Sequence, residues 1–314
     1  MLAPKDPKIK KRPMRDFVCK LPWAFIYLGR RQREELPMKW KLVADSGATI
    51  SPDLFAGTDV AFELVPLMIN IGTQVYVDDA NLDMATFVKD MHDSKEASST
   101  ACPSPQAYAN AFEGAENVIC FTISSGLSGS YNSAQLGRNM ALEENPLANI
   151  YIFDCLSAGT ENDLLIAKGL ELVESGLDFD QVVASLKDYH QKTDVVFILE
   201  SVDNLVKAGR VNRLVGGMIG LLGIRLIGVR TPEGKIEIGA KSKGSKRAVK
   251  ATVEEMLKHG YQGGKVAISH SDNPEVVEAV SALLREHYPQ AQIEVVDFNG
   301  LCTFYAQYHG LIIG

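Results

Sequence analysis

Residues 117–134 read Asn117-Val-Ile-Cys-Phe-Thr-Ile-Ser-Ser-Gly-Leu-Ser-Gly-Ser-Tyr-Asn-Ser-Ala134. The apolar run from Val118 to Ile123 stops at a Ser/Gly turn, and a helical pattern resumes near Ser128, which predicts a buried strand, a tight loop and a helix N-terminus. The first N–H groups of a helix lack partners within it and carry partial positive charge, so this turn favours a phosphate or carboxylate. The turn also offers four hydroxyl donors: Ser124, Ser125, Ser128 and Ser130.

The same residues have a plainer interpretation. Serine and glycine are ordinary helix caps and turn residues, and the local pattern by itself favours a cap over a ligand site. The choice between the two therefore depends on the rest of the chain.

Strand and helix patterns alternate from Trp40 onward. Up to residue 200 we expect a strand opening at Trp40, further strands at 62–71, 74–79, 118–123, 148–154 and 194–199, and helices at 82–91, 107–112, 164–173 and 179–190. Residues 97–106 are expected to form a rigid extended loop because of their prolines and hydroxyls. Such alternation indicates an α/β fold with a mainly parallel sheet, whose ligand crevice lies beyond the carboxyl ends of the strands, where the serine turn falls.

The pattern changes after residue 200, and we expect two α/β domains: 42–200, and a smaller one over 201–314. The segments 224–229 and 235–240 flank Thr231-Pro-Glu-Gly234, which predicts a β-hairpin. Helices are expected at 245–259 and 274–287, and strands at 265–269 and 292–297. The strand 194–199 is expected to close the first domain.

Composition limits the class of protein. The chain has 314 residues, of which 46% are hydrophobic and 23% charged, as in soluble globular proteins, and no run approaches the roughly 20 apolar residues of a membrane span. No apolar signal region follows the basic N-terminus, so a cytoplasmic location is expected. The five cysteines and six histidines show no metal-ligand spacing, which predicts neither a metal centre nor a disulfide framework.

Charge is distributed unevenly along the chain. Residues 1–41 hold twelve Lys/Arg against four Asp/Glu, although the whole chain has a net charge of −7. A basic arm can bind nucleic acid or an anionic membrane surface, but this one is short, rich in proline and joined to an acidic body. We therefore expect a solvated N-terminal extension and no nucleic-acid partner.

Several segments of the chain, taken together, match the motifs of one known protein family. They are Leu42-Val-Ala-Asp-Ser-Gly, Ser99-Thr-Ala-Cys-Pro-Ser-Pro105, Ile123-Ser-Ser-Gly-Leu-Ser-Gly-Ser-Tyr-Asn-Ser-Ala134, Val202-Asp-Asn-Leu-Val-Lys-Ala-Gly-Arg-Val211 and Leu221-Leu-Gly-Ile-Arg-Leu-Ile227. This set resembles the DegV family, the bacterial fatty-acid-binding proteins that serve fatty acid kinase. The resemblance covers about residues 42–314.

The resemblance implies a two-domain protein that holds one long-chain fatty acid between its domains, with the tail buried and the carboxyl near the serine turn. Family members present the carboxylate to a separate ATP-dependent kinase, which makes acyl phosphate for phospholipid synthesis, so neither catalysis by this chain nor a cofactor is expected. By position, Thr100 and Ser128 are the carboxyl-binding hydroxyls and Arg210 lies near the head group and the kinase. Ser125 and Gly129 complete the predicted ligand site.

The chain departs from the family pattern in three main places. The Gly-Gly-Arg stretch of the family is Ala208-Gly209-Arg210 here. The loop usually reads Thr-Ser-Gln-Pro but here is Thr100-Ala101-Cys102-Pro103, and residues 301–310 do not match the Thr-His-Thr-Gly-Pro-Gly run of the family. The family's histidine would fall near Ala306, with His309 close by but out of register.

Two enzyme classes are the alternatives. A serine hydrolase needs G-x-S-x-G, whereas residues 126–130 read Gly-Leu-Ser-Gly-Ser, and no Asp/His pair is placed to activate the serine. A phosphate- or anion-binding α/β enzyme could use the same helix N-terminus, but both usual glycine-rich phosphate motifs are absent. A lipid tail would instead need apolar walls, for which residues 62–71 and 214–226 are the candidates.

Overall fold

The computed structural model of the chain describes residues 38–212 and 223–314. Positions 1–37 of the predicted basic extension and 214–222 of the predicted apolar wall lie outside the described residues. Strand β1 (Met38–Asp45) includes the last residues of that extension, so the first sheet begins before residue 42. Within the described ranges, no helix is both long and apolar enough to cross a membrane.

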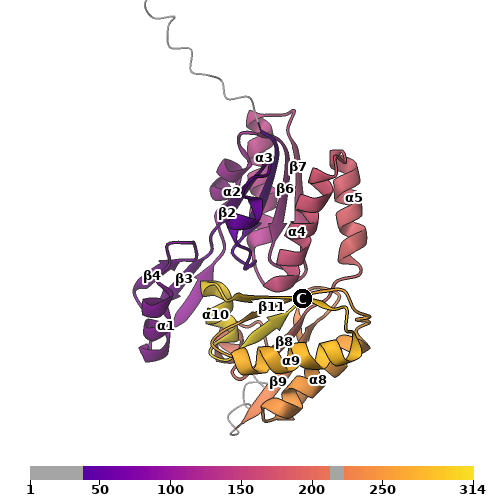
Figure 1. Ribbon diagram of the computed structural model, residues 1–314. Helices are drawn as coiled ribbons and strands as arrows, with labels where there is room; N and C mark the ends of the chain where they lie inside the picture. The colour runs from indigo at the N-terminus through magenta and orange to yellow at the C-terminus, as the bar shows by residue number, and fades with distance from the viewer. Residues whose placement is uncertain (1–37, 213–222) are drawn as a thin grey trace, which may run out of the picture. The chain divides into compact units, whose positions relative to one another are not determined.

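The first sheet is fully parallel, as the alternation of strands and helices predicts. Its order is β2-β1-β6-β7, with β2 (Val60–Val65), β6 (Ala115–Thr122) and β7 (Asn149–Asp154) beside β1. Helices α2 (Pro105–Phe112) and α3 (Ser130–Glu144) pack on one face, and α4 (Thr160–Glu174) and α5 (Phe179–His190) pack on the other (Figure 1). Because both faces are covered, the central strands end in continuous buried apolar runs, Leu42–Ala44 in β1 and Val118–Phe121 in β6.

The second sheet is mixed and has the order β10-β9-β8-β13-β11-β12. Its strands are β8 (Val196–Leu199), β9 (Ile224–Arg230), β10 (Ile236–Lys243), β11 (Lys265–His270), β12 (Gln292–Asp297) and β13 (Leu311–Ile313). Helices α8 (Ser245–Lys258) and α9 (Pro274–His287) cover one face, and α6 (Asp203–Lys207) and α10 (Gly300–Ala306) pack on the other. The hairpin predicted around residues 231–234 is present as β9 and β10, which pair antiparallel.

One strand assignment from the sequence is wrong. The segment 194–199 was expected to close the first sheet, but β8 pairs antiparallel with β9 and with β13 in the second sheet. All four residues of β8 are buried, and a fully buried apolar run does not reveal which sheet it joins. The domain boundary near residue 200 stays a prediction.

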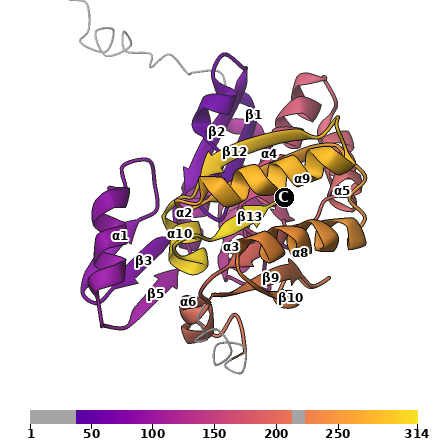
Figure 2. The same ribbon diagram turned by 60° about the horizontal axis from the view of Figure 1, so that its bottom comes forward.

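A third, small sheet separates from the first at Pro66. The segment 62–71, expected as one bent strand or an edge, is two strands in different sheets: β2, and β3 (Met68–Ile71) in the order β4-β3-β5. Strand β4 is Gln74–Val77, and β5 is Ser98–Ala101, which lies inside the segment expected as a loop. Helix α1 (Met84–Asp93) packs on this sheet through Phe87, beside β3 and β5 in Figure 2. The sheet carries Thr100 toward α10.

Candidate functional site

The serine turn lies between the end of β6 and the start of α3, at the carboxyl edge of the parallel sheet. The N-cap of α3 is Gly129, and no side chain caps the helix. Ser128 Oγ accepts a hydrogen bond from the Ser130 N–H at 3.2 Å and lies 3.0 Å from Ser130 Oγ. Ser128, which precedes the N-cap, thus bonds to a first-turn N–H as a capping residue does, so its hydroxyl has a local structural partner.

The first two serines of the turn have structural partners. Ser124 Oγ donates to the Gly234 carbonyl at 2.7 Å and accepts from the Gly126 N–H at 3.0 Å. The Ser125 N–H donates to Asp154 Oδ1 at 3.1 Å, and the Ser125 side chain faces solvent. Since a carboxylate already occupies the N–H of Ser125, this backbone group is not free for an anionic ligand.

Buried Asp45 anchors the strand end that leads into the turn. Its carboxylate accepts hydrogen bonds from the N–H groups of Ile123, at 3.0 and 3.1 Å to its two oxygens, and Gly47, at 3.0 Å, and from the hydroxyl of Tyr108 at 3.2 Å. Burial raises the pKa of Asp45 to about 6, although these bonds and the Ser130 hydroxyl favour the charged form. The backbone that enters the turn is thus fixed by a buried carboxyl group that has hydrogen bonds with four residues: Ile123, Gly47, Tyr108 and Ser130.

A pocket opens beside the turn, and its lining is mostly apolar. About 680 Å³ of space inside it and at its mouth is not filled by atoms, a volume that includes open solvent. Twelve lining residues are apolar: Leu67, Ile123, Leu127, Ala158, Phe197, Leu199, Leu205, Ile236, Leu301, Cys302, Ala306 and Ile312. They come from strands of the second sheet, from α6 and α10, and from the segments that follow β2, β6 and β7, so the pocket lies between the second sheet and the carboxyl edge of the first.

Four polar residues complete the lining: Thr100, Ser128, Arg210 and Tyr305. The hydroxyls of Thr100 and Tyr305 are 2.8 Å apart. Arg210 Nε donates to the Leu127 carbonyl at 2.8 Å, which ties the segment after α6 to the serine turn. The polar groups thus come from the third sheet, the turn, α10 and the segment after α6.

The segment after β5 approaches the start of α3. A Cβ added at Gly129 would lie 3.2 Å from the sulfur of Cys102, which shows how closely the two segments pass. Cys102 stands where the family pattern has glutamine, so a small thiol replaces an amide beside the head of the helix. Cys102 thus lies beside the N-cap residue of α3, on the segment that carries Thr100.

The structure brings three of the five predicted site residues together. Thr100, Ser128 and Arg210 line the pocket, whereas Ser125 and Gly129 lie outside its lining on the exposed side of the turn. Their roles as ligands stay predictions. The predicted apolar wall contributes through Leu67.

Sequence reasoning missed Tyr305. The expected replacements for the family's histidine were Ala306, which does line the pocket, and His309, which instead lies 3.4 Å from a Glu200 carboxylate oxygen outside it. Tyr305 precedes the expected position by one residue, and a hydroxyl-bearing aromatic at the end of a short apolar helix was the available signal. Its partner, Thr100, is 205 residues away in the chain.

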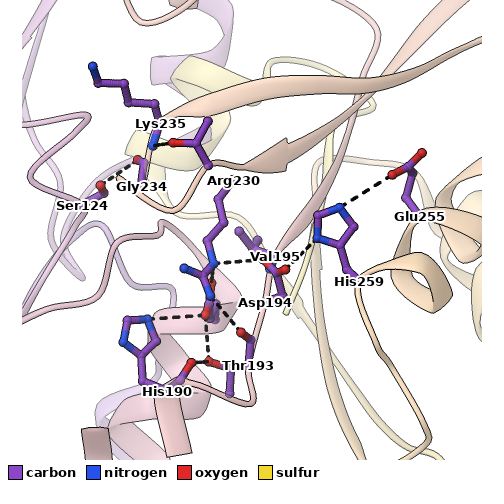
Figure 3. A network of polar contacts seen from close by, with 12 residues as sticks. Ser124, His190, Thr193, Asp194, Val195, Arg230, Gly234, Lys235, Glu255 and His259 are labelled. Carbon is purple, nitrogen blue, oxygen red and sulfur yellow. Dashed lines mark hydrogen bonds and ion pairs between the residues drawn. The ribbon is translucent and has the colours of Figure 1, made fainter.

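The turn end of the hairpin of β9 and β10 is held by two sets of contacts (Figure 3). At its tip, Gly234 contacts Ser124, as described above. At the end of β9, Arg230 forms ion pairs with Asp194 at 2.9 Å and with Glu161 at 3.4 Å. Burial raises the pKa of Glu161 to about 7, although Arg230 favours its charged form. This cluster joins the second sheet to α4.

Two histidines extend the same cluster. His259 Nδ1 lies 2.8 Å from Asp194, and His190 Nε2 lies 3.7 Å from Glu161. Burial, with Arg230 nearby, lowers the pKa of His190. The cluster does not line the apolar pocket. It holds the turn end of the hairpin against α4.

Comparison with known proteins gives a consistent result. The family described as an uncharacterised protein family, DegV, matches residues 39–308. A DegV domain-containing protein of Streptococcus pyogenes serotype M1 is 46% identical over 277 residues, which cover 88% of this chain and 99% of that relative.

Solved structures show the same fold. The fatty acid kinase (Fak) B3 protein of Streptococcus pneumoniae, loaded with linoleic acid, has a TM-score of 0.84 and 43% identity over 88% of this chain and 98% of its own. A DegV family protein of Eubacterium eligens, loaded with heptadecanoic acid, has a TM-score of 0.83 and 31% identity over 87% of this chain and 98% of its own.

Proposed function

Because the chain belongs to the DegV family, we propose that it binds one long-chain fatty acid in the apolar pocket and presents the carboxylate to a fatty acid kinase. The observation that carries this proposal is the lining itself, in which twelve apolar side chains accompany only four polar ones. The two similar structures named above contain linoleic and heptadecanoic acid, which are ligands of this class. The tail would lie among the apolar side chains and the carboxylate near Thr100 and Ser128.

The energetics agree with this division of roles. Burial of about fifteen methylenes at roughly 0.8 kcal/mol each gives a gross term on the order of 12 kcal/mol. Part of that term offsets the loss of translational and chain freedom on binding. A hydrogen bond to a charged group contributes only about 1.5–3 kcal/mol. The tail therefore supplies most of the affinity, and the hydroxyls orient the head.

The polar end of the pocket suits handover to a second protein. Arg210 lines the pocket and is also exposed, and its side chain donates to the carbonyls of Leu127 and Ala208. A guanidinium fixed in this way can face an approaching acidic or phosphorylated group. We infer that the chain itself performs no catalysis, and that the kinase supplies ATP and the phosphoryl transfer in the cytoplasm.

The alternative function, a phosphate-binding enzyme at the same turn, is less well supported by the geometry. The Ser125 N–H is taken by Asp154, and the pocket beside the turn is lined mainly by carbon. A multiply charged phosphate would lose its hydration there without gaining enough donors.

Denaturing mass spectrometry of solvent extracts tests the proposal. The purified chain should carry a fatty acid of roughly fourteen to eighteen carbons at near one per chain, because an apolar cavity of this kind is unfavourable to fill with water. Delipidated protein should gain thermal stability when fatty acid is added back. Absence of both the bound lipid and the thermal shift would contradict the proposal.

A further inference from the structure

Tyr305 joins two parts of the pocket that come from different sheets. The residue lies on α10, which packs on the second sheet, and its hydroxyl reaches Thr100 on β5 of the third sheet at 2.8 Å. The ring is half-buried, packs against Leu67, Ile123 and Leu301, and also lines the pocket. Tyr305 is therefore a pocket residue and a clamp at once.

Helix α10 is held firmly where it begins. The Asp78 carboxylate accepts hydrogen bonds from the N–H groups of Gly300 at 2.8 Å and Leu301 at 3.1 Å, and Asn299 caps the helix through the Cys302 N–H at 2.9 Å. The tyrosine ring also makes an edge contact with Phe304, with ring centroids 4.9 Å apart. The phenol is thus presented from a fixed support and not from a mobile loop.

A count of hydrogens shows what the hydroxyl pair can do. Each hydroxyl carries one hydrogen, and the bond between Thr100 and Tyr305 uses only one of the two. A phenol donates more readily than an aliphatic alcohol, so the favoured arrangement has Tyr305 donating to Thr100 Oγ1. That leaves the Thr100 hydrogen for a third partner and polarises its O–H bond, which makes Thr100 a better donor.

We propose that Tyr305 is a positioning residue that holds the Thr100 hydroxyl as a donor toward the ligand head group, and so sets the preference of the site for a free carboxylate over a neutral head group. This inference rests on the proposed function. Without the phenol, the Thr100 hydroxyl would rotate freely or bond to nearby backbone groups. Among the described residues, Arg210 is the one cation in the lining, and its two hydrogen bonds given above go to carbonyls. Its charge favours an acid whether or not the phenol is present, so the part of the discrimination that depends on Tyr305 comes from the hydroxyl pair.

A purely structural clamp would behave differently. If Tyr305 only fixed α10 against β5, its removal would weaken acids and neutral lipids alike, because the tail contacts would loosen for both. A positioning role acts on the head group alone, and it acts through Thr100. The ratio of the affinities for an acid and its methyl ester separates the two roles.

The experiment compares Tyr305→Phe with wild type and with Tyr308→Phe, a matched control whose exposed hydroxyl bonds to Asp272 away from the pocket. Palmitate and methyl palmitate compete with a fluorescent fatty acid, and thermal melting checks the fold. Tyr305→Phe should weaken palmitate binding about fivefold, as expected for one lost hydrogen bond, and change methyl palmitate binding by less than about twofold. Tyr308→Phe should match wild type.

A double mutant completes the test. In a Thr100→Val background, adding Tyr305→Phe should change the acid-to-ester ratio no further, since the group through which it acts is gone. Equal losses for acid and ester, or a second loss in the Thr100→Val background, would overturn the inference while leaving fatty acid binding in place. Failure of wild type to bind palmitate would instead overturn the proposed function, and the role of Tyr305 with it.

Discussion

Ser124 and Gly234 are 110 residues apart in the chain, yet the Ser124 hydroxyl donates to the Gly234 carbonyl at 2.7 Å. The contact is closely packed on both sides. A Cβ added at Gly234 would lie 2.2 Å from Ser124 Oγ, and one added at Gly126 would lie 2.6 Å from the Glu233 carbonyl. The tip of the hairpin therefore rests directly on the turn that carries Ser128.

Gly234→Ala should destabilise the protein more than the cost of a positive φ alone would. Gly234 has φ +70° and crowded surroundings, so we expect a loss of about 3 kcal/mol in the free energy of unfolding from strain and overpacking together. Gly57→Ala is the matched control, because Gly57 has φ +80° with nothing within 4 Å of the added Cβ, and should lose only about 1 kcal/mol. Urea unfolding measures both. Equal losses of unfolding free energy in the two variants would mean that the hairpin moves away from the added methyl group at no cost.

The first sheet could be predicted from sequence because its strands are buried on both faces and separated by helices. The run from Val118 to Ile123 and the helix after it were placed correctly for this reason. Strand β8 was misplaced because its neighbours, β9 and β13, come from remote parts of the chain. Strand β13 was not expected at all, since three apolar residues carry too little pattern.

The site could be predicted only as far as the family motifs reach. Thr100, Ser128 and Arg210 stand in such motifs, and all three line the pocket. Tyr305 stands in the divergent C-terminal segment, and its bond to Thr100 depends on the packing of α10 against the third sheet. No local pattern in residues 301–310 contains that information.

Arg210→Ala should impair kinase-dependent acyl phosphate formation more than fatty acid binding. The guanidinium is exposed and donates to backbone carbonyls, so its removal would alter the surface offered to the kinase while the apolar lining stays in place. We expect transfer to fall by about tenfold or more, and lipid affinity to change by less than about threefold. A coupled assay with purified kinase measures the rate of acyl phosphate formation, and competition binding measures the lipid affinity. Lys207→Ala, which removes an exposed cation from α6, is the control, and equal losses in both assays would identify Arg210 as a head-group ligand.

Stability should fall as pH rises from about 5 to 7. Burial raises the pKa of Glu161 to about 7 from an ordinary 4.5, so between these values the folded state binds more protons than the unfolded state, and the free energy of unfolding decreases with pH. Asp163 has a pKa raised to about 7 by burial and acts in the same direction. Each such group contributes at most about 1.4 kcal/mol per pH unit within its window.

Glu161→Gln isolates one of these groups. The amide does not titrate, so the decline in the free energy of unfolding between pH 5 and pH 7 should become shallower by up to one proton's contribution, while Arg230 keeps its ion pair with Asp194. Urea titrations at four pH values would measure the slope. Glu171→Gln, which changes an exposed carboxylate of the same helix, should leave the slope near that of wild type. An unchanged slope in Glu161→Gln would mean that this carboxyl is ionised throughout the range.

The last prediction separates the serines of the turn. Ser128 lines the pocket, whereas Ser125 lies outside its lining and faces solvent, although both were predicted as ligands. Ser128→Ala should weaken palmitate binding by about tenfold, because a lost hydrogen bond to a carboxylate is worth roughly 1.5–3 kcal/mol, and should change methyl palmitate binding far less. Ser125→Ala should leave both affinities within about twofold of wild type, since the bond to Asp154 comes from its backbone. Competition of both lipids for a fluorescent fatty acid gives the four affinities. A loss in Ser125→Ala equal to that in Ser128→Ala would move the head group to the outer side of the turn, against the exposed N-terminus of α3.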